Sequence, residues 1–209
     1  MRIVDFPQGT DEWRAARAGK VTASRMCDVL AKIKTGEAAA RRDYRAQLVA
    51  EILTGQPQDD GYINKEMQWG IDHEPLARAA YELANDCYVD KVGFVLHPTL
   101  HRAGCSPDGL VGTDGMVEIK CPKTATHLQY LMDGCAPREH LPQMHWGLAC
   151  CERKWVDFIS FDPRLPERLR LFKVRVMRDD ELIKEYEREV WRLLAEVDKQ
   201  IATIKAFGA

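Results

Sequence analysis

The segment MVEIKC, which begins at Met116, most constrains the fold because its apolar and charged residues alternate. In this segment, apolar Val117 and Ile119 alternate with charged Glu118 and Lys120. Successive side chains of a β-strand point to opposite faces, so the pattern predicts a strand that buries its apolar residues and presents an acid and a base from its other face. The rest of the chain must then supply a sheet and a core around this strand.

A second carboxylate precedes this strand, with nine residues between Asp108 and Glu118. The residues between them include the turn-forming run VGTDG, which favours a hairpin that brings Asp108 beside Glu118 on the neighbouring strand. Two carboxylates with room for water and phosphate oxygens are a usual way to hold Mg²⁺, and Lys120 could orient or deprotonate a water on that ion. The spacing therefore indicates phosphodiester hydrolysis. A surface hairpin with a cross-strand ion pair is the alternative interpretation.

Four sequence blocks occur in order between about Trp13 and Pro163. The central block reads CSPDGL from Cys105 and EIKCP from Glu118, with Thr124 close behind. The other three blocks are Arg17-x-Gly19-x-x-Thr22-Ala23-Ser24, the pair Trp69-Gly70 followed by Glu74, and Gln143 within LPQM. Together they resemble the motifs of the phage lambda exonuclease family, the YqaJ-type viral recombinases, which are alkaline exonucleases of the PD-(D/E)XK nuclease superfamily.

This resemblance implies a Mg²⁺-dependent 5′-to-3′ exonuclease. Such an enzyme digests one strand of linear double-stranded DNA and leaves 3′ single-stranded overhangs for phage-type recombination by single-strand annealing. Two Mg²⁺ ions are expected, with Mn²⁺ as a substitute. The family forms ring-shaped trimers around DNA and works with a single-strand annealing protein, so we expect a homotrimer, that partner, and a prophage origin in a bacterial host.

The resemblance also assigns roles to residues around the hairpin. Asp108, Glu118 and the Ile119 carbonyl are expected to bind metal. Lys120 is expected to position the attacking water, and Glu74 to support the site as an additional acid.

The remaining assignments concern DNA. The resemblance implies that Arg17 and Ser24 hold the terminal 5′-phosphate, while Ser106 and Gln143 contact the site or the scissile region. A helix that starts at Thr22 would place Ser24 in its first turn, where exposed N–H groups favour an anion. Helix capping by Ser24, with Arg17 solvated, is the alternative.

Two other functions stay open from the residues alone. An endonuclease of the same fold would use the same carboxylates and lysine. A catalytically inert DNA-binding module is the second alternative, although the presence of Asp108, Glu118 and Lys120 argues against it.

The length and pattern of the chain predict one domain over residues 1–209, which the resemblance implies is a nuclease domain. It comprises a helical part at about 1–86, a catalytic sheet core at about 87–178 and a C-terminal helix at about 179–206. Strands are expected within 88–97, 101–105, 116–121, 154–161 and 171–176, which gives an α/β fold, a mixed sheet of about five strands flanked by helices. This arrangement is consistent with the restriction-endonuclease-like PD-(D/E)XK core that the resemblance implies.

Two helices carry further expectations. The pattern from Asn64 to Asn85 predicts a helix whose buried residues are Met67, Ile71, Leu76, Ala80 and Leu83. The near-heptad stripe from Leu182 to Ile204 predicts a long amphipathic helix that packs on the domain's own sheet or on another subunit.

Charge and cysteine content limit the function classes. A net charge of −2 excludes a globally basic DNA coat, so any DNA-binding surface must be local. Residues 1–50 hold ten Lys and Arg against six Asp and Glu, whereas residues 179–209 hold five against eight. Arg41, Arg42 and Arg45 are candidates for contacts to the DNA backbone, or form a solvated helix face. The seven scattered cysteines fit reduced thiols of a cytoplasmic protein, and no apolar run reaches the length of about 18 residues that spans a membrane.

Overall fold

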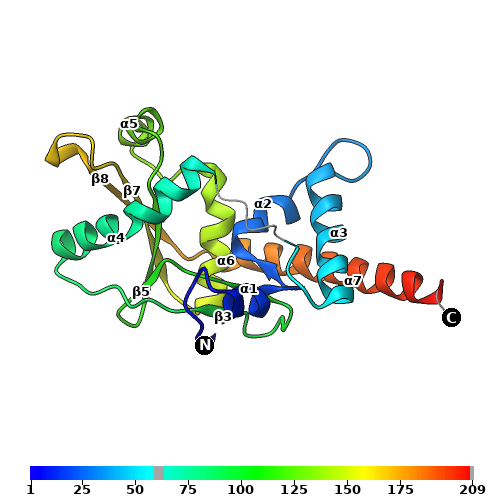
Figure 1. Ribbon diagram of the computed structural model, residues 1–209. Helices are drawn as coiled ribbons and strands as arrows, with labels where there is room; N and C mark the ends of the chain where they lie inside the picture. Colours follow the sequence, from blue (N-terminus) through cyan, green and yellow to red (C-terminus); the bar gives the residue numbers. More distant parts are fainter. Residues whose placement is uncertain (59–63, 208–209) are drawn as a thin grey trace.

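The structure, a computed structural model, describes residues 1–58 and 64–207 (Figure 1). Its strands form two four-stranded sheets. The first has the order β1-β3-β4-β2 and consists of β1 (Arg2–Val4), β3 (Phe94–Leu96), β4 (Ala103–Cys105) and β2 (Val21–Thr22). The second has the order β5-β6-β7-β8 and consists of β5 (Gly109–Val111), β6 (Gly115–Lys120), β7 (Trp155–Phe161) and β8 (Leu171–Met177). In the second sheet β6 and β7 are parallel, and the other neighbours are antiparallel.

Helices surround the two sheets. The α-helices are α1 (Asp11–Arg17), α2 (Met26–Val29), α3 (Ala39–Thr54), α4 (Lys65–Asn85), α5 (Thr124–Asp133), α6 (Leu141–Cys151) and α7 (Asp180–Ala206). Three short 3₁₀-helices are η1 (Ala23–Arg25), η2 (Arg138–His140) and η3 (Glu167–Leu169).

Side-chain caps begin three of the α-helices. The side chains of Thr10, Asn64 and Asp179 accept hydrogen bonds from backbone N–H groups in the first turns of α1, α4 and α7. These N–H groups lack partners within the helix, so each cap stabilises a helix start that the sequence favours. Gly55 ends α3 in the left-handed region, at a φ of 68°.

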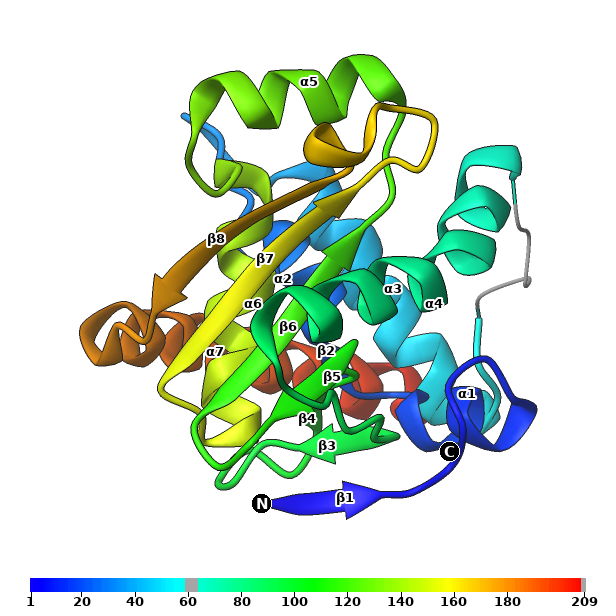
Figure 2. The same ribbon diagram turned by 90° about the vertical axis from the view of Figure 1, so that its left-hand side faces the viewer.

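The second sheet is covered on both faces (Figure 2). On one face Met116 and Phe158 join the main core with Trp146 of α6. On the other face Ala77 and Tyr81 of α4 belong to a smaller cluster with apolar residues of β6 and β7. Both faces of β6 are therefore buried, which the alternating sequence alone did not predict, and its charged residues lie beneath α6.

The mixed α/β class is confirmed, and the structure extends the predicted strand set. Each of the five predicted segments contains a strand, and β1, β2 and β5 are additional strands of two or three residues. Such short strands have too few residues for an alternating pattern. Two of them, β1 and β2, lie in the N-terminal part that the sequence indicated to be helical.

The predicted buried face of α4 is wrong for four of its five residues, while Ala80 is partly buried against the smaller cluster. Met67, Ile71 and Leu76 are about half exposed, at 50%, 54% and 53%, and Leu83 is 88% exposed. The helix instead packs on the sheet through Ala77 and Tyr81. These two residues are four positions apart, so they lie on the same face of the helix.

The amphipathic C-terminal helix is confirmed and packs within the same chain. Val190, Leu193 and Val197 of α7 belong to the main core. The helix lies beside α3 and α6 (Figure 1). None of the helices within residues 1–58 and 64–207 is long and apolar enough to cross a membrane.

Candidate active site on the β5–β6 hairpin

The predicted hairpin is present and brings the two carboxylates together. Its register pairs Gly109 with Val117, so Asp108 enters the hairpin level with Glu118. Oδ2 of Asp108 accepts a hydrogen bond of 2.6 Å from the backbone N–H of Ile119. Position 109 requires glycine, since a Cβ there would lie 2.1 Å from Cγ1 of Val89. Val89 therefore packs directly against the backbone next to Asp108.

Glu118 is the best-connected side chain of the hairpin and is only 2% exposed. Its Oε1 accepts hydrogen bonds from Nζ of Lys120 at 2.5 Å and from Nε2 of Gln143 at 2.6 Å. Gln143 lies in the first turn of α6, which covers this face of β6. The structure therefore brings Asp108, Glu118, Lys120 and Gln143 into one cluster.

The cluster carries closely spaced negative charge. Burial, followed by the charge of Glu118, raises the pKa of Asp108 to about 8. Burial alone would lower the pKa of Lys120, but the charges of Glu118 and Asp108 outweigh it and the pKa is raised. Lys120 therefore stays protonated at neutral pH, and Asp108 keeps its proton to a higher pH than an ordinary carboxyl group.

These residues fit a hard divalent cation. Asp108 and Glu118 offer carboxylate oxygens, and the raised pKa of Asp108 reflects its burial and the nearby negative charge of Glu118, which a cation would neutralise. The described residues contain no group of three or more His, Cys, Asp or Glu side chains that could hold a metal. A site here therefore depends on two carboxylates, a backbone oxygen and water. Mg²⁺ suits such a site, since it keeps several waters and binds through one or two carboxylates.

Glu74 approaches the hairpin from α4. Its carboxylate accepts a hydrogen bond from Arg78, one turn further along the helix. Its charge also acts on the hairpin, because it contributes to the raised pKa of Asp108. Burial and then Glu74 raise the pKa of Cys121 to about 12. Glu74 is thus a neighbour of the carboxylate cluster that is ion-paired within its own helix.

Arg17 and Ser24 line a separate cavity of about 200 Å³. The Arg17 guanidinium lies 3.9 Å from the ring centroid of Trp13. Ser24 lies in η1, where its Oγ is 3.4 Å from Oγ1 of Thr22. The helix predicted to start at Thr22 is a 3₁₀ turn followed by the four-residue α2, so Ser24 lies in a short 3₁₀-helix rather than in the first turn of an α-helix.

Sequence reasoning missed further basic residues in this cavity, which we call the Arg17 cavity. Arg14, Lys20 and Arg25 also line it. Burial lowers the pKa of Lys20, partly offset by the charge of Glu51. Their closeness to Arg17 in the sequence could have identified them, since Arg14 lies in α1, Lys20 in the turn that follows and Arg25 in η1.

Ser106 lies between the Arg17 cavity and the carboxylate cluster. Its Oγ accepts a hydrogen bond of 3.0 Å from Nε1 of Trp13, the residue beneath Arg17. Ser106 is also two residues before Asp108 in the chain. This hydrogen bond connects α1 to the start of the hairpin. It therefore links the Arg17 cavity to the carboxylate cluster.

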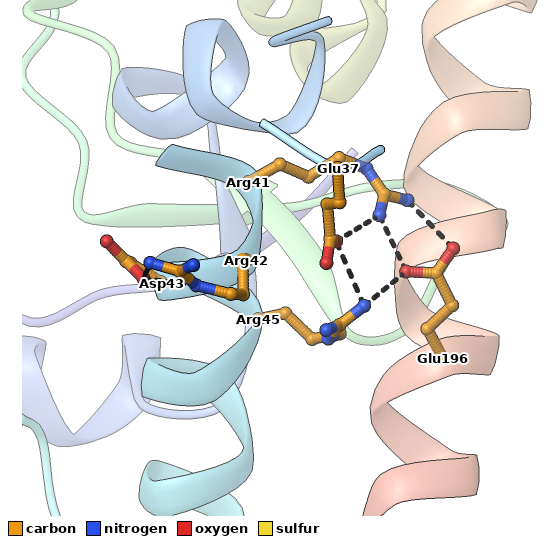
Figure 3. Close-up of polar contacts among 6 residues, drawn as sticks. All are labelled: Glu37, Arg41, Arg42, Asp43, Arg45 and Glu196. Carbon is orange, nitrogen blue, oxygen red and sulfur yellow. Dashed lines mark hydrogen bonds and ion pairs between the residues drawn. The ribbon is translucent and has the colours of Figure 1, made fainter. Parts of the chain in front are cut away.

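Two of the three clustered arginines of α3, Arg41 and Arg45, point toward α7, which fits neither of the two interpretations of the cluster (Figure 3). Arg41 forms hydrogen bonds of 2.6 and 3.1 Å to the carboxylate of Glu196 in α7, and Arg45 contacts the same residue at 3.1 Å. Both also contact Glu37 at 2.9 Å. Arg41 and Arg45 therefore join α3 to α7 and form neither a DNA-facing cluster nor a solvated face.

The contact between α3 and α7 also explains why the N-terminal part of the sequence has a surplus of basic residues and the C-terminal part a surplus of acidic ones. The basic N-terminal part meets the acidic C-terminal helix at Arg41 and Glu196, and Lys32 and Glu189 form a further pair at 3.3 Å. Arg42 points away from this interface and contacts its neighbour Asp43 (Figure 3).

Comparisons with known proteins place the chain in a family. The family described as the YqaJ-like viral recombinase domain matches residues 12–154, which is more than half of the chain. The crystal structure of an alkaline exonuclease, LHK-Exo from Laribacter hongkongensis, is 45% identical, with a TM-score of 0.88. The match covers 95% of this chain and 98% of that one.

Two further structures extend the comparison. LHK-Exo in complex with dAMP matches with the same identity and coverage and a TM-score of 0.89. A phage related exonuclease from Haemophilus somnus 129PT is 16% identical over 88% of this chain and 96% of that one, with a TM-score of 0.69, which shows the shared fold. No curated protein matches the chain. The family match and the identity with LHK-Exo confirm the relationship indicated by the motifs, and the chain belongs to the YqaJ-like viral recombinase family.

Proposed function

We propose that this protein is a Mg²⁺-dependent deoxyribonuclease of recombination, which digests one strand of linear duplex DNA in the 5′-to-3′ direction and leaves 3′ overhangs. The observation that carries the proposal is the convergence of Asp108 and Glu118 on one hairpin with Lys120. Its family membership and its 45% identity to an alkaline exonuclease support the same chemistry.

The carboxylate cluster would hold the metal. Asp108, Glu118 and the Ile119 carbonyl supply its oxygen ligands, with two Mg²⁺ ions expected and Mn²⁺ as a substitute. When bound, the ions stabilise the negative charge that develops on the phosphate during displacement. Ionised Asp108 is favoured by such a cation, since a nearby positive charge lowers a carboxyl pKa.

Four side chains around the cluster would orient water and substrate. Lys120 is protonated, so it donates a hydrogen bond to the attacking water and does not accept its proton. Gln143 is held against Glu118 at 2.6 Å and can turn its amide to the scissile phosphate. Glu74 and Ser106 support the water and DNA from α4 and from the start of the hairpin.

The 5′-to-3′ direction would come from the Arg17 cavity. Arg17 has a planar fork of donors that suits a phosphate, and Ser24 adds a hydroxyl in the same cavity. The additional cations Arg14, Lys20 and Arg25 strengthen the attraction for a dianion. A terminal 5′-phosphate bound there would place the first phosphodiester bond toward Asp108.

Assembly is the remaining part of the proposal. We expect a homotrimer that encircles duplex DNA and cooperates with a single-strand annealing protein. Light scattering of the purified protein should give about three times the chain mass of 23.8 kDa. A monomer would remove the ring and leave the chemistry of the hairpin unaffected.

Single substitutions test the catalytic part directly. Asp108→Ala, Glu118→Ala and Lys120→Ala should each lose nearly all cleavage of linear duplex DNA in Mg²⁺ while the circular dichroism spectrum stays that of the folded protein. Asp114→Ala in the turn of the same hairpin is the matched control, since Asp114 contacts Lys154 at 3.0 Å away from the cluster. Full activity in any of the first three variants would refute the assignment.

A further inference from the structure

A second cavity opens at the carboxyl-terminal end of β6, next to the carboxylate cluster. It has a volume of about 290 Å³, and we call it the Trp69 pocket. Its lining comes from three segments: Lys65, Glu66 and Trp69 of α4, Cys121 to Lys123 after β6, and Arg164 after β7. Since successive Cα atoms lie about 3.8 Å apart, Cys121 begins the pocket wall about that distance from Lys120.

The sheet topology explains why these segments meet. Strands β6 and β7 are parallel, so their carboxyl-terminal ends lie at the same edge of the sheet. The connection from β6 to α5 and the connection from β7 to β8 leave from that edge (Figure 2). Arg164 in the second connection donates a hydrogen bond of 3.2 Å to the carbonyl of Pro122 in the first.

Arg164 is held in a fixed position by a buried acid. Its Nε and Nη2 donate to the carboxylate of Asp162 at 2.7 and 3.0 Å, and Asp162 is 0% exposed. Burial alone would raise the pKa of Asp162, but hydrogen bonds from Arg164 and Thr124 outweigh it and the pKa is about 2. Asp162 therefore stays ionised and orients the guanidinium.

The guanidinium still presents donors to the pocket. The Arg164 side chain is 45% exposed, and its Nη1 hydrogen-bonds to none of the described residues. Lys65 and Lys123 add two cations, against Glu66 and Asp162, which leaves a surplus of one positive charge. The pair of Lys123 with Glu66 at 3.0 Å is exposed, so it is weak and can exchange for another anion.

Trp69 defines what kind of ligand fits. One face of its ring stacks on His73 at a centroid distance of 3.6 Å. The Arg164 guanidinium lies over the ring at 4.4 Å. Since side chains of the protein already stack on the ring, a nucleobase has no open platform there, and the available contacts are cationic donors that suit an anion.

We propose that the Trp69 pocket binds a backbone phosphate of the DNA close to the scissile bond, with Arg164 as the principal contact and Lys65 and Lys123 as supporting cations. The proposal rests on the function proposed above. A fixed arginine fork matches a phosphate, and contacts to phosphates set the register of a protein on DNA. The pocket would thus hold the strand in register with the carboxylate cluster.

The test measures DNA binding in the absence of cleavage. Fluorescence anisotropy of a labelled linear duplex is recorded in EDTA over a series of KCl concentrations. Arg164→Ala should weaken binding about ten- to a hundredfold and reduce the slope of log K against log salt by about 1. Arg168→Ala is the matched control, because Arg168 lies exposed in η3 of the same connection and does not line the pocket.

A second variant keeps the test decisive if Arg164→Ala does not fold. Arg164→Ala leaves buried Asp162 without its partner, which destabilises proteins. The double variant Lys65→Ala/Lys123→Ala removes exposed cations of the same pocket and should also reduce the salt slope by about 1 or more.

The outcomes separate this inference from the proposed function. If the unchanged protein digests DNA but the folded Arg164→Ala variant keeps its affinity and salt slope, the pocket does not bind phosphate. If Arg164→Ala does not fold, an unchanged slope in the double lysine variant overturns the inference equally. If the unchanged protein neither binds nor digests DNA, the proposed function fails as well.

Discussion

Replacing Asp108 by asparagine should stabilise the metal-free protein at neutral pH. The pKa of Asp108 is raised to about 8 by burial and by Glu118, whereas in the unfolded chain it is about 3.9. Between these values the folded state binds a proton that the unfolded state has released. Folding stability is therefore greatest below about pH 4, falls as the pH rises, and reaches its minimum above about pH 8.

The magnitude follows from the pKa difference. Each pH unit above 3.9 removes about 1.36 kcal/mol of folding free energy, so the loss is up to about 4 kcal/mol at pH 7. Asparagine does not titrate and can keep the hydrogen bond from the Ile119 N–H. Asp108→Asn should thus gain up to that amount at pH 7, more at pH 8, and almost nothing at pH 4.

Urea unfolding in EDTA at pH 4, 6, 7 and 8 measures this gain. Asp114→Asn, in the turn of the same hairpin, is the control and should change stability by less than about 0.5 kcal/mol at every pH. Adding Mg²⁺ at pH 8 should stabilise the unchanged protein and have less effect on Asp108→Asn, since the variant lacks one carboxylate ligand. A gain that is absent, or is the same at pH 4 and pH 8, would refute the described crowding of charge around Asp108.

Other predictions test the water-orienting residue, the DNA end and the α3–α7 interface. Lys120→Ala should lower the cleavage rate about 10²- to 10⁴-fold at saturating DNA; a mere rise in KM would contradict its role. Arg17→Ala should lose about ten- to a hundredfold in rate on 5′-phosphorylated ends and little on 5′-hydroxyl ends, and equal slowing of both would exclude end recognition. Arg41→Ala should destabilise the fold by about 1–3 kcal/mol because it removes two of the three arginine hydrogen bonds to Glu196, while Arg42→Ala should stay within about 0.5 kcal/mol in the same unfolding assay; equal effects of the two would refute the interface.

The sequence predicted the centre of the molecule well because that part depends on local rules. Strict alternation from Met116 identified β6, and a turn-forming run of the right length paired it with β5. These patterns specify which residues neighbour each other across a hairpin. The alternation and the turn together therefore predict that Asp108 lies beside Glu118, without information on any tertiary contact.

The features that the sequence did not predict depend on contacts between segments that are far apart in the sequence. The burial of Glu118 depends on α6, whose Gln143 is 25 residues away in sequence. The true contact face of α4 depends on the sheet that it meets, and apolar residues such as Ile71 lie on other faces of the helix. The inward orientation of Arg41 depends on Glu196, 155 residues away. Local periodicity contains no information about such partners.

The most direct test of the central claim is digestion of DNA with defined ends in Mg²⁺. A linear duplex with a 5′-phosphate and a distinct label on each strand is compared with the same sequence as a covalently closed circle. We predict that one strand of the linear duplex is degraded from its 5′ end, that the strand ending 3′ at the same terminus persists as an overhang, and that the circle stays intact. Cleavage of the closed circle, or removal of the 3′-ended strand first, would contradict the account.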